Sequence, residues 1–264
     1  LILFLIESCG LFRKPLRTTV IALMDIIADR KVVKFVPLIS RLFNRFLRSD
    51  FRFQGLPNLF DVWSELKSIG LSEDGANQVT DVVACPGTDS CKMGITSSMG
   101  VAAALRTAIR EFGVDDPLIR SLHVKVSGCP NGCGQHHVAD IGFHGAAAKA
   151  PGGQIPAYEL FLGGNYGDNR VEDSRIGTRI PRVKIPAKLA PQMVREIATY
   201  YKDQRQGQES FNQFLDRVGL EELTAVAVAA QAKAESAESG SDMYVDWERT
   251  NLYKLERGEG ECAI

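Results

Sequence analysis

Four of the six cysteines form two short pairs whose thiolates could hold a metal centre. The first pair, Cys85 and Cys91, lies in ACPGTDSCKMG, and the second pair, Cys129 and Cys133, lies in SGCPNGCGQHH. Each pair opens with Cys-Pro. Thiolates are preferred ligands of zinc and of iron–sulfur clusters. The sequence therefore predicts one metal site with four thiolate ligands.

Three kinds of site could use these cysteines. The paired ligands of zinc knuckles are usually about two to four residues apart, and the five residues between Cys85 and Cys91 exceed that spacing. Disulfides need an oxidising compartment, which sparse cysteines do not indicate. Iron–sulfur loops vary in spacing and often include Cys-Pro. The residues favour a cluster, with zinc as the alternative.

The elements around the pairs predict that the two pairs meet. A strand is expected at residues 78–84, a helix at 97–113 and a strand at 121–128. A strand–helix–strand crossover usually makes the two strands parallel, so their ends share one edge of the sheet. Cys85 directly follows the first strand and Cys129 the second. The expected helix would direct its first N–H groups toward Cys91, where they would stabilise an anionic cluster.

The glycines and histidines beside the cysteines could have several structural roles. Gly87, Gly128, Gly132 and Gly134 would let backbone amides approach sulfur, although turn formation explains them equally well. His136 and His137 follow the second pair and are expected to cap or pack rather than bind metal, because four thiolates already complete a cluster.

Composition limits the kinds of binding partner and the cellular location that are expected. A formal net charge of −1 over 264 residues predicts neither a nucleic acid nor an anionic membrane as partner. No apolar run reaches the roughly 18 residues of a membrane span, and the cysteine usage predicts a cytoplasmic protein. No G-x-G-x-x-G turn is present, so electrons are expected from an outside donor instead of a nucleotide bound here.

Four motifs in order carry a family resemblance. The stretches ACPGTDSCKMG, SGCPNGCGQHHVADIGFHG, YELFLGGN and RIGTRIPR resemble the C-terminal half of the sirohaem-dependent sulfite and nitrite reductases, over about residues 51–220. The resemblance implies an α+β chain. Its parts would be a ferredoxin-like half-domain and then an α/β iron–sulfur/sirohaem domain with a mixed sheet flanked by helices.

The resemblance also implies site residues. By motif, the [4Fe–4S] ligands are Cys85, Cys91, Cys129 and Cys133. Cys133 would in addition bridge to the sirohaem iron, which makes it the catalytic residue, and Asn131 would lie against the sirohaem.

The implied reaction is the six-electron reduction of sulfite to sulfide or of nitrite to ammonia, with sulfite slightly preferred. The implied donor is ferredoxin or a flavoprotein. A locally basic region could meet an acidic donor: Arg170, Arg175, Arg179, Arg182, Lys184 and Lys188. The alternative function is a non-catalytic iron–sulfur electron carrier or structural metal-binding domain.

The chain divides into four expected regions. Residues 1–50 are amphipathic and basic without an assigned role, 51–80 would be a partial ferredoxin-like half-domain, 81–223 the cluster and sirohaem domain, and 224–264 a linker and tail. The aromatic residues of the tail are expected to dock it on the body. Because the sequence opens with leucine, we expect a fragment of a longer protein.

Further elements follow from periodicity and turn residues. Strands are expected at residues 138–143 and 155–165, joined around Pro151, Gly152 and Gly153. Helices are expected at 190–204 and 209–219.

Overall fold

The computed structural model describes residues 56–72, 75–112, 115–167, 174–235, 238 and 241–255. The chain divides into two compact units, Leu1–Asp74 and Gly75–Ile264. In the first, helix α4 (Leu56–Ser68) is described, where the apolar spacing of NLFDVWSELKSIGLS, residues 58–72, predicts a helix. The amphipathic pattern of residues 1–50, residues 51–55 and Arg170 lie outside the described residues. The stretch FRFQGLP, residues 51–57, predicts a short strand and a turn, and its last two residues instead begin α4. The proposed domain boundaries therefore remain a prediction.

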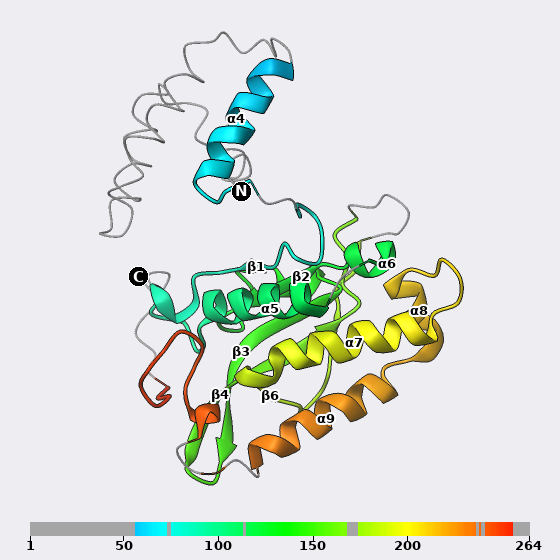
Figure 1. Ribbon diagram of the computed structural model, residues 1–264. Helices are drawn as coiled ribbons and strands as arrows, with labels where there is room; N and C mark the ends of the chain where they lie inside the picture. Colours follow the sequence, from blue (N-terminus) through cyan, green and yellow to red (C-terminus); the bar gives the residue numbers. More distant parts are fainter. Residues whose placement is uncertain are drawn as a thin grey trace, which may run out of the picture. The chain divides into compact units, whose positions relative to one another are not determined.

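The second unit is built on a mixed sheet (Figure 1). Its strands, among the described residues, run in the order β1–β2–β3–β4–β5, and β6 pairs with β4. Their bounds are Val83–Ala84, Val124–Ser127, Ile141–Ala150, Gly153–Leu162, Thr178–Arg179 and Ile185–Pro186. The pairs β1–β2 and β2–β3 are parallel, and the others are antiparallel. A mixed sheet with helices agrees with the expected fold class.

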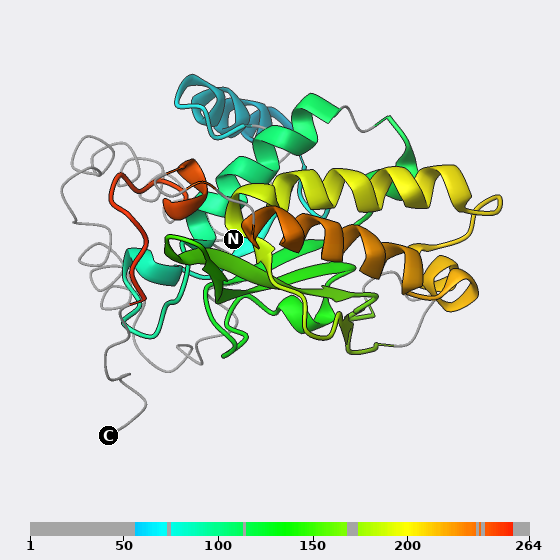
Figure 2. The same ribbon diagram turned by 90° about the horizontal axis from the view of Figure 1, so that it is seen from below.

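The long helices cover one face of this sheet (Figure 2). They are α5 (Ser98–Phe112), α7 (Ala190–Gln204) and α9 (Glu221–Glu235), and the shorter helices are α6 (Pro117–Arg120) and α8 (Phe211–Val218). Helix α5 is amphipathic because Val101, Leu105 and Ile109 recur at every fourth position, and all three are buried. The helix layer and the sheet therefore enclose one apolar core.

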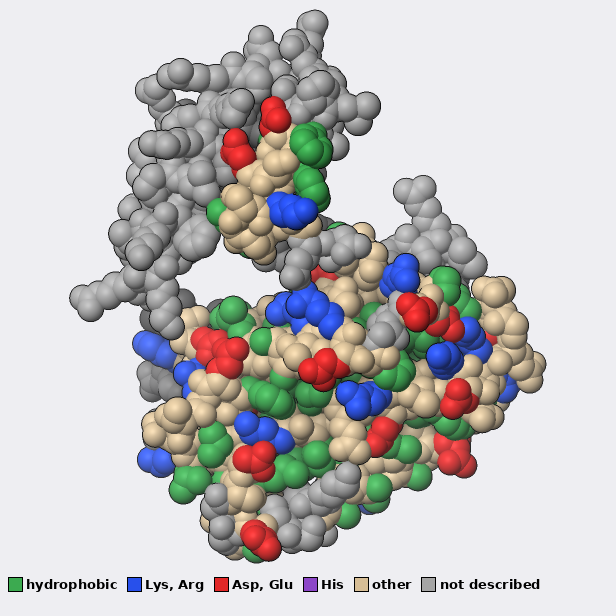
Figure 3. Space-filling model, in the orientation of Figure 1, with side chains coloured by type: hydrophobic (Ala, Val, Ile, Leu, Met, Phe, Trp, Pro, Cys, Tyr) green, Lys and Arg blue, Asp and Glu red, His purple; other side chains and the backbone are tan. Residues whose placement is uncertain are grey.

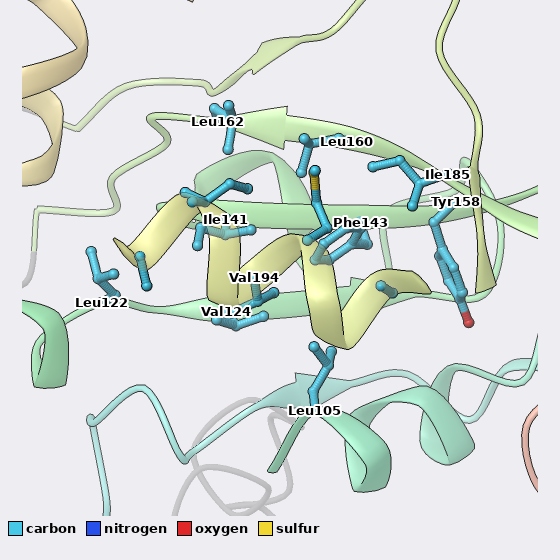
Figure 4. Close-up of a cluster of buried hydrophobic side chains, with 14 of the residues drawn as sticks. Leu105, Leu122, Val124, Ile141, Phe143, Tyr158, Leu160, Leu162, Ile185 and Val194 are labelled. Carbon is cyan, nitrogen blue, oxygen red and sulfur yellow. The ribbon is translucent and has the colours of Figure 1, made fainter. Parts of the chain in front are cut away.

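Alternate residues of the central strands supply the other half of that core. Phe143 and Leu160 are paired across β3 and β4, and both are fully buried beneath α7, as Figure 4 shows. Tyr158 lies in the same row, and its hydroxyl donates to the Ser97 carbonyl at 3.1 Å. The core thereby reaches the start of α5, which follows the first cysteine pair.

Two different connections join the three parallel strands. Helix α5 carries the chain from β1 to β2 across the helical face, as the strand–helix–strand pattern predicts. The connection from β2 to β3 is residues 128–140, about the shortest length that a parallel return permits. It contains the second cysteine pair and the 3₁₀ turn η3 (His136–Val138). Both cysteine pairs therefore leave the same edge of the sheet.

Most expected elements are confirmed, with differences in length. The helix at 190–204 has the expected bounds, and the β3–β4 hairpin turns at Pro151, Gly152 and Gly153, with Gly153 at φ +134°. The strand expected at 78–84 shortens to two residues, because turns closed by Gln78 and Asp81 amides use up its first part. The local sequence pattern does not show that these turns replace the first part of the strand.

The C-terminal region is folded onto the body. Leu223 and Ala227 of α9 are buried in the core, and Tyr244, in the 3₁₀ turn η5 (Asp242–Tyr244), is also buried. The expected docking of the tail's aromatic residues is thus confirmed for Tyr244. Among the described helices, none has the length and apolar character needed to cross a bilayer.

Candidate functional site

Gly128, the residue before Cys129, joins the two cysteine loops. Its carbonyl oxygen accepts hydrogen bonds from the amides of Ile95 and Thr96, at 2.8 and 3.1 Å. Its own amide donates to the sulfur of Cys85 at 3.1 Å. The close approach that was expected of this glycine is confirmed, and it brings a residue of the second loop into contact with a sulfur of the first.

Cys85 is fixed from three sides. Its amide donates to the Val126 carbonyl at 3.2 Å and so extends the β1–β2 pairing by one residue. Ser98, the first residue of α5, donates its hydroxyl to the Cys85 carbonyl at 2.6 Å, and the two side chains lie 3.4 Å apart. Cys85 is therefore held between the end of a strand, the start of a helix and Gly128.

The first cysteine loop turns tightly through the 3₁₀ turn η2 (Gly87–Asp89). Gly87 has φ +55°, and a Cβ on it would lie 2.3 Å from the Ser98 hydroxyl. The Cys91 amide donates to the Gly87 carbonyl at 3.0 Å, which folds the loop back on itself. Cys91 is exposed at the surface of this compact loop.

Ser127 organises the second loop from the end of β2. Its hydroxyl accepts from the Gly134 amide at 3.0 Å and lies 2.8 Å from Nδ1 of His136. Cys129 is buried, whereas Cys133 is exposed, as is Asn131 between them. The expected closeness of Gly134 to a sulfur does not appear among the hydrogen bonds, because its amide binds Ser127.

The thiol of Cys133 is influenced by the other three thiols. The pKa of the Cys133 thiol is raised, first by partial burial of the sulfur and then by the thiols of Cys85, Cys129 and Cys91, although the residue as a whole is exposed. Within the described ranges, no three His, Cys, Asp or Glu side chains are grouped closely enough to hold a single metal ion.

His136 is a buried polar residue with one unused nitrogen. The residue is fully buried, and its Nε2 has no hydrogen-bond partner. Burial is the main cause that lowers the pKa of His136 to about 3, and His137 and His144 contribute to the same shift. The rings of His137 and Phe161 lie 3.8 and 4.7 Å from its ring, centroid to centroid. His136 thus packs as a neutral ring, as expected, on the sheet face opposite the long helices.

A second polar group lies beside it on the same face. Glu159 accepts from Arg179 at 2.8 Å, and its carboxylate lies 3.5 Å from Nε2 of His144. Burial lowers the pKa of His144, whereas the Gly145 carbonyl and Glu159 raise it. The sequence reasoning did not single out His144 or Glu159, since they are separated by a hairpin and are brought together by strand register alone.

Most described side chains of the basic region already have partners within the chain. Arg175 pairs with Asp216, Arg179 pairs with Glu159, and the Lys184 ammonium donates to the Ala147 carbonyl. The remaining members described are Arg182, which is exposed, and Lys188, which lies over the ring of Trp247. On the face drawn in Figure 3, basic and acidic side chains are interspersed. Most of these cations therefore serve the fold.

Comparison with known sequences identifies relatives. The family model described as "Nitrite and sulphite reductase 4Fe-4S domain" matches residues 75–234. The chain is 31% identical to the sulfite reductase [ferredoxin] of Synechococcus elongatus and 32% identical to the sulfite reductase [NADPH] hemoprotein beta-component of Aeromonas hydrophila. Each match covers 58% of this chain and 22% or 25% of the relative. The chain thus spans about a quarter of these relatives' length.

Two solved structures share the fold. The Mycobacterium tuberculosis NirA protein matches with a TM-score of 0.52 at 23% identity, over 62% of this chain and 30% of that one. Dissimilatory sulfite reductase I matches with a TM-score of 0.51 at 12% identity, over 75% and 62%. The mixed sheet with its helix layer is therefore an arrangement found in both of these proteins.

The expected cofactors, a [4Fe–4S] cluster and sirohaem, are supported by these matches. The chemistry of the residues fits the cluster: four thiols stand on two loops that Gly128 joins, the Gly128 amide already donates to the Cys85 sulfur, and neither Gly87 nor Gly128 has room for a Cβ. The family match, which covers more than half of the chain, decides between cluster and zinc in favour of the cluster. The chain belongs to the nitrite and sulphite reductase 4Fe-4S domain family of oxidoreductases.

Proposed function

We propose that this chain is the cluster-binding part of a sulfite or nitrite reductase. In this proposal Cys85, Cys91, Cys129 and Cys133 ligate the [4Fe–4S] cluster, and Cys133 is shared with the sirohaem iron. The observation that supports it most is the hydrogen bond from Gly128, in the second cysteine loop, to the Cys85 sulfur in the first. This bond joins residues 43 positions apart at one edge of the sheet.

The chain's own groups would hold and tune the centre. When bound, the cluster and sirohaem supply one-electron transfer to the substrate anion. The Gly128 amide would stabilise negative charge on the Cys85 sulfur, since N–H···S bonds favour the reduced, more anionic state. The exposed positions of Asn131 and Cys133 suit residues that lie against a second, larger group.

The reaction proposed is the six-electron reduction of sulfite to sulfide or of nitrite to ammonia, with sulfite preferred. The test uses the longest natural chain that contains this sequence, loaded with both cofactors and reduced with methyl viologen. We expect about six electrons consumed per anion and a higher kcat/KM for sulfite. A tenfold preference for nitrite would reverse the substrate assignment, and no turnover of either anion would contradict the proposed reaction.

An iron–sulfur electron carrier is the second candidate. It is supported by the four thiols, which would complete a cluster without sirohaem. Addition of sirohaem to the cluster-loaded chain distinguishes the two functions. A stably bound chromophore whose absorption changes with sulfite or nitrite supports the reductase, whereas a redox-active cluster without sirohaem binding supports the carrier.

The electron donor is proposed to be ferredoxin or a flavoprotein, because the named relatives include ferredoxin-dependent and NADPH-dependent enzymes. Arg182 is an exposed member of the basic region and suits a charge-reversal test. If an acidic donor docks there, Arg182→Glu should lower the rate with reduced ferredoxin and weaken its salt dependence. An equal rate with a small chemical reductant is the matched control. The cytoplasmic location also remains a prediction.

A further inference from the structure

The segment of residues 241–255 contacts the first cysteine loop although it lies about 150 residues away in sequence. Asp246 is 4% exposed, and its Oδ2 accepts from the Ser97 amide at 2.7 Å, directly before α5. Its Oδ1 accepts from the Trp247 amide at 2.8 Å. Both carboxylate oxygens are therefore used, one of them by the start of the helix that leaves the cysteine loop.

Two further residues of this segment hold the loop. Tyr253 donates its hydroxyl to the Ile95 carbonyl at 3.1 Å. Arg249 pairs with Asp89, which lies between Cys85 and Cys91. Figures 1 and 2 both draw the segment, in red, beside this loop. The contacts extend from the turn inside the cysteine pair to the first residues after it.

The same segment is attached to the body at separate points. The indole nitrogen of Trp247 donates to the Ala187 carbonyl at 2.8 Å, and the Lys188 ammonium lies 4.5 Å from the centre of its ring. Tyr244 accepts from the Gly152 amide at 2.8 Å, at the turn of the hairpin. The segment thus links the cysteine loop to the sheet, and the family match, which ends at residue 234, does not include it.

We propose that residues 241–255 form a clamp on the first cysteine loop, in which Asp246 is a positioning residue that fixes the start of α5 and lowers the reduction potential of the cluster. This inference rests on the proposed cluster ligation by Cys85 and Cys91. The clamp acts through Ser97 and the loop, without contact to the cluster itself.

The effect on potential follows from charge. Ser97 precedes Ser98, whose hydroxyl lies 3.4 Å from the Cys85 sulfur. The carboxylate of Asp246 is therefore linked through these two serines to the surroundings of a proposed ligand. A buried anion there opposes the addition of an electron to the cluster. Burial raises the pKa of Asp246, whereas the Ser97 and Trp247 amides, Arg249 and Lys188 lower it. Potentials should therefore be measured at about pH 8, because alkaline solution favours the ionised carboxylate.

Three variants of the full chain separate charge from shape. Asp246→Asn keeps the size but removes the charge and one acceptor, Asp246→Ala removes both acceptors, and Tyr244→Phe breaks a contact of the same segment far from the loop. Each is reconstituted anaerobically with iron and sulfide. The measurements are iron and labile sulfide content, the cluster's midpoint potential, and the rate of iron loss to a chelator.

We expect a less negative potential for Asp246→Asn and iron loss at least about tenfold faster for Asp246→Ala, since a buried hydrogen bond to a charged group is lost. Tyr244→Phe should match the wild type in potential and retention. Wild-type potential and retention in both Asp246 variants would overturn the clamp. A wild-type chain that assembles no cluster would instead contradict the proposed function, so the two failures are distinguishable.

Discussion

The amide of Gly128 donates a hydrogen bond to the sulfur of Cys85 at 3.1 Å, across 43 residues of sequence. The same glycine accepts from Ile95 and Thr96 through its carbonyl oxygen. The two loops that carry the proposed ligands are therefore joined by backbone groups of one residue. Backbone groups are fixed by the fold, so the junction between the two loops is part of the fold itself.

Replacement of Gly128 by alanine should damage the site. A Cβ there would lie 2.6 Å from the Gly87 Cα and 2.9 Å from the Thr96 carbonyl oxygen, and these backbone atoms must then move apart. We expect Gly128→Ala to cost about 1–3 kcal/mol of unfolding free energy and to reduce cluster content severalfold. Urea unfolding and iron analysis measure both effects.

Gly207→Ala is the matched control. Gly207 has φ +59° but nothing within 4 Å of an added Cβ, so the substitution costs about 1 kcal/mol through the left-handed conformation alone. Its cluster content should equal that of the wild type. Equal cluster content in Gly128→Ala and Gly207→Ala would show that the loop junction is not needed for assembly.

The four cysteines should differ in what their loss does. With both cofactors bound, Cys133→Ser should uncouple the sirohaem from the cluster and abolish nearly all turnover, because a serine oxygen is a harder and less polarisable bridge than thiolate. Cys85→Ser should act first on cluster content. Magnetic spectroscopy of the two variants measures the coupling. Normal coupling in Cys133→Ser would assign the bridge to another residue.

In the folded chain, the His136 ring should remain neutral at pH values well below the usual pKa of histidine. Its folded pKa is about 3, and its unfolded pKa is about 6.5. Between those values the unfolded state binds more protons, so this residue makes stability rise with pH up to about 6.5 and adds no pH dependence above that. In NMR of the cluster-free chain, the His136 ring signal, assigned with His136→Phe, should not shift between pH 7.5 and 5. A midpoint near 6.5 would mean that the ring is hydrated.

The ion pair between Asp116 and Arg205 should stabilise the fold in a pH-dependent way. Asp116 also caps α6 through the Leu118 amide, and its hydrogen bond with Arg205 is the main cause that lowers the pKa of its carboxyl. Its stabilisation is then fully present above about pH 4 and is lost as pH falls through the lowered folded value. Asp116→Asn should cost about 1–3 kcal/mol at pH 7.

The exposed pair of Arg175 with Asp216 provides the comparison, since solvent screens it. Asp216→Asn should cost about 0.5 kcal/mol or less at any pH. The difference between wild type and Asp116→Asn should shrink between pH 5 and 3 in urea unfolding. A constant difference over that range would contradict the lowered pKa of Asp116.

The parts of the fold that were predictable have strong local signals. The helix at 190–204 shows a regular apolar stripe, and the β3–β4 hairpin is marked by a Pro-Gly-Gly turn. The convergence of Cys85 with Cys129 followed from the handedness of a parallel crossover and needed no contact information. These features are encoded within about 50 residues of sequence.

Other features depend on long-range contacts that no periodic pattern in the sequence predicts. Asp246 bonds to Ser97 across 149 positions, and the tail's sequence shows only that aromatic residues are present. Ser98 is one of several serines near the helix start, and only the fold selects it as the partner of Cys85. Single polar contacts of this kind are set by tertiary structure, so sequence pattern could not identify them.

The most direct test of the central claim is the metal content of this chain after anaerobic assembly with iron and sulfide. The account predicts about four irons and about four labile sulfides per chain, with retention lost when Cys85, Cys91, Cys129 or Cys133 is replaced by serine. A chain that instead retains a single zinc ion and no labile sulfide, or one whose cluster survives all four substitutions, would contradict it.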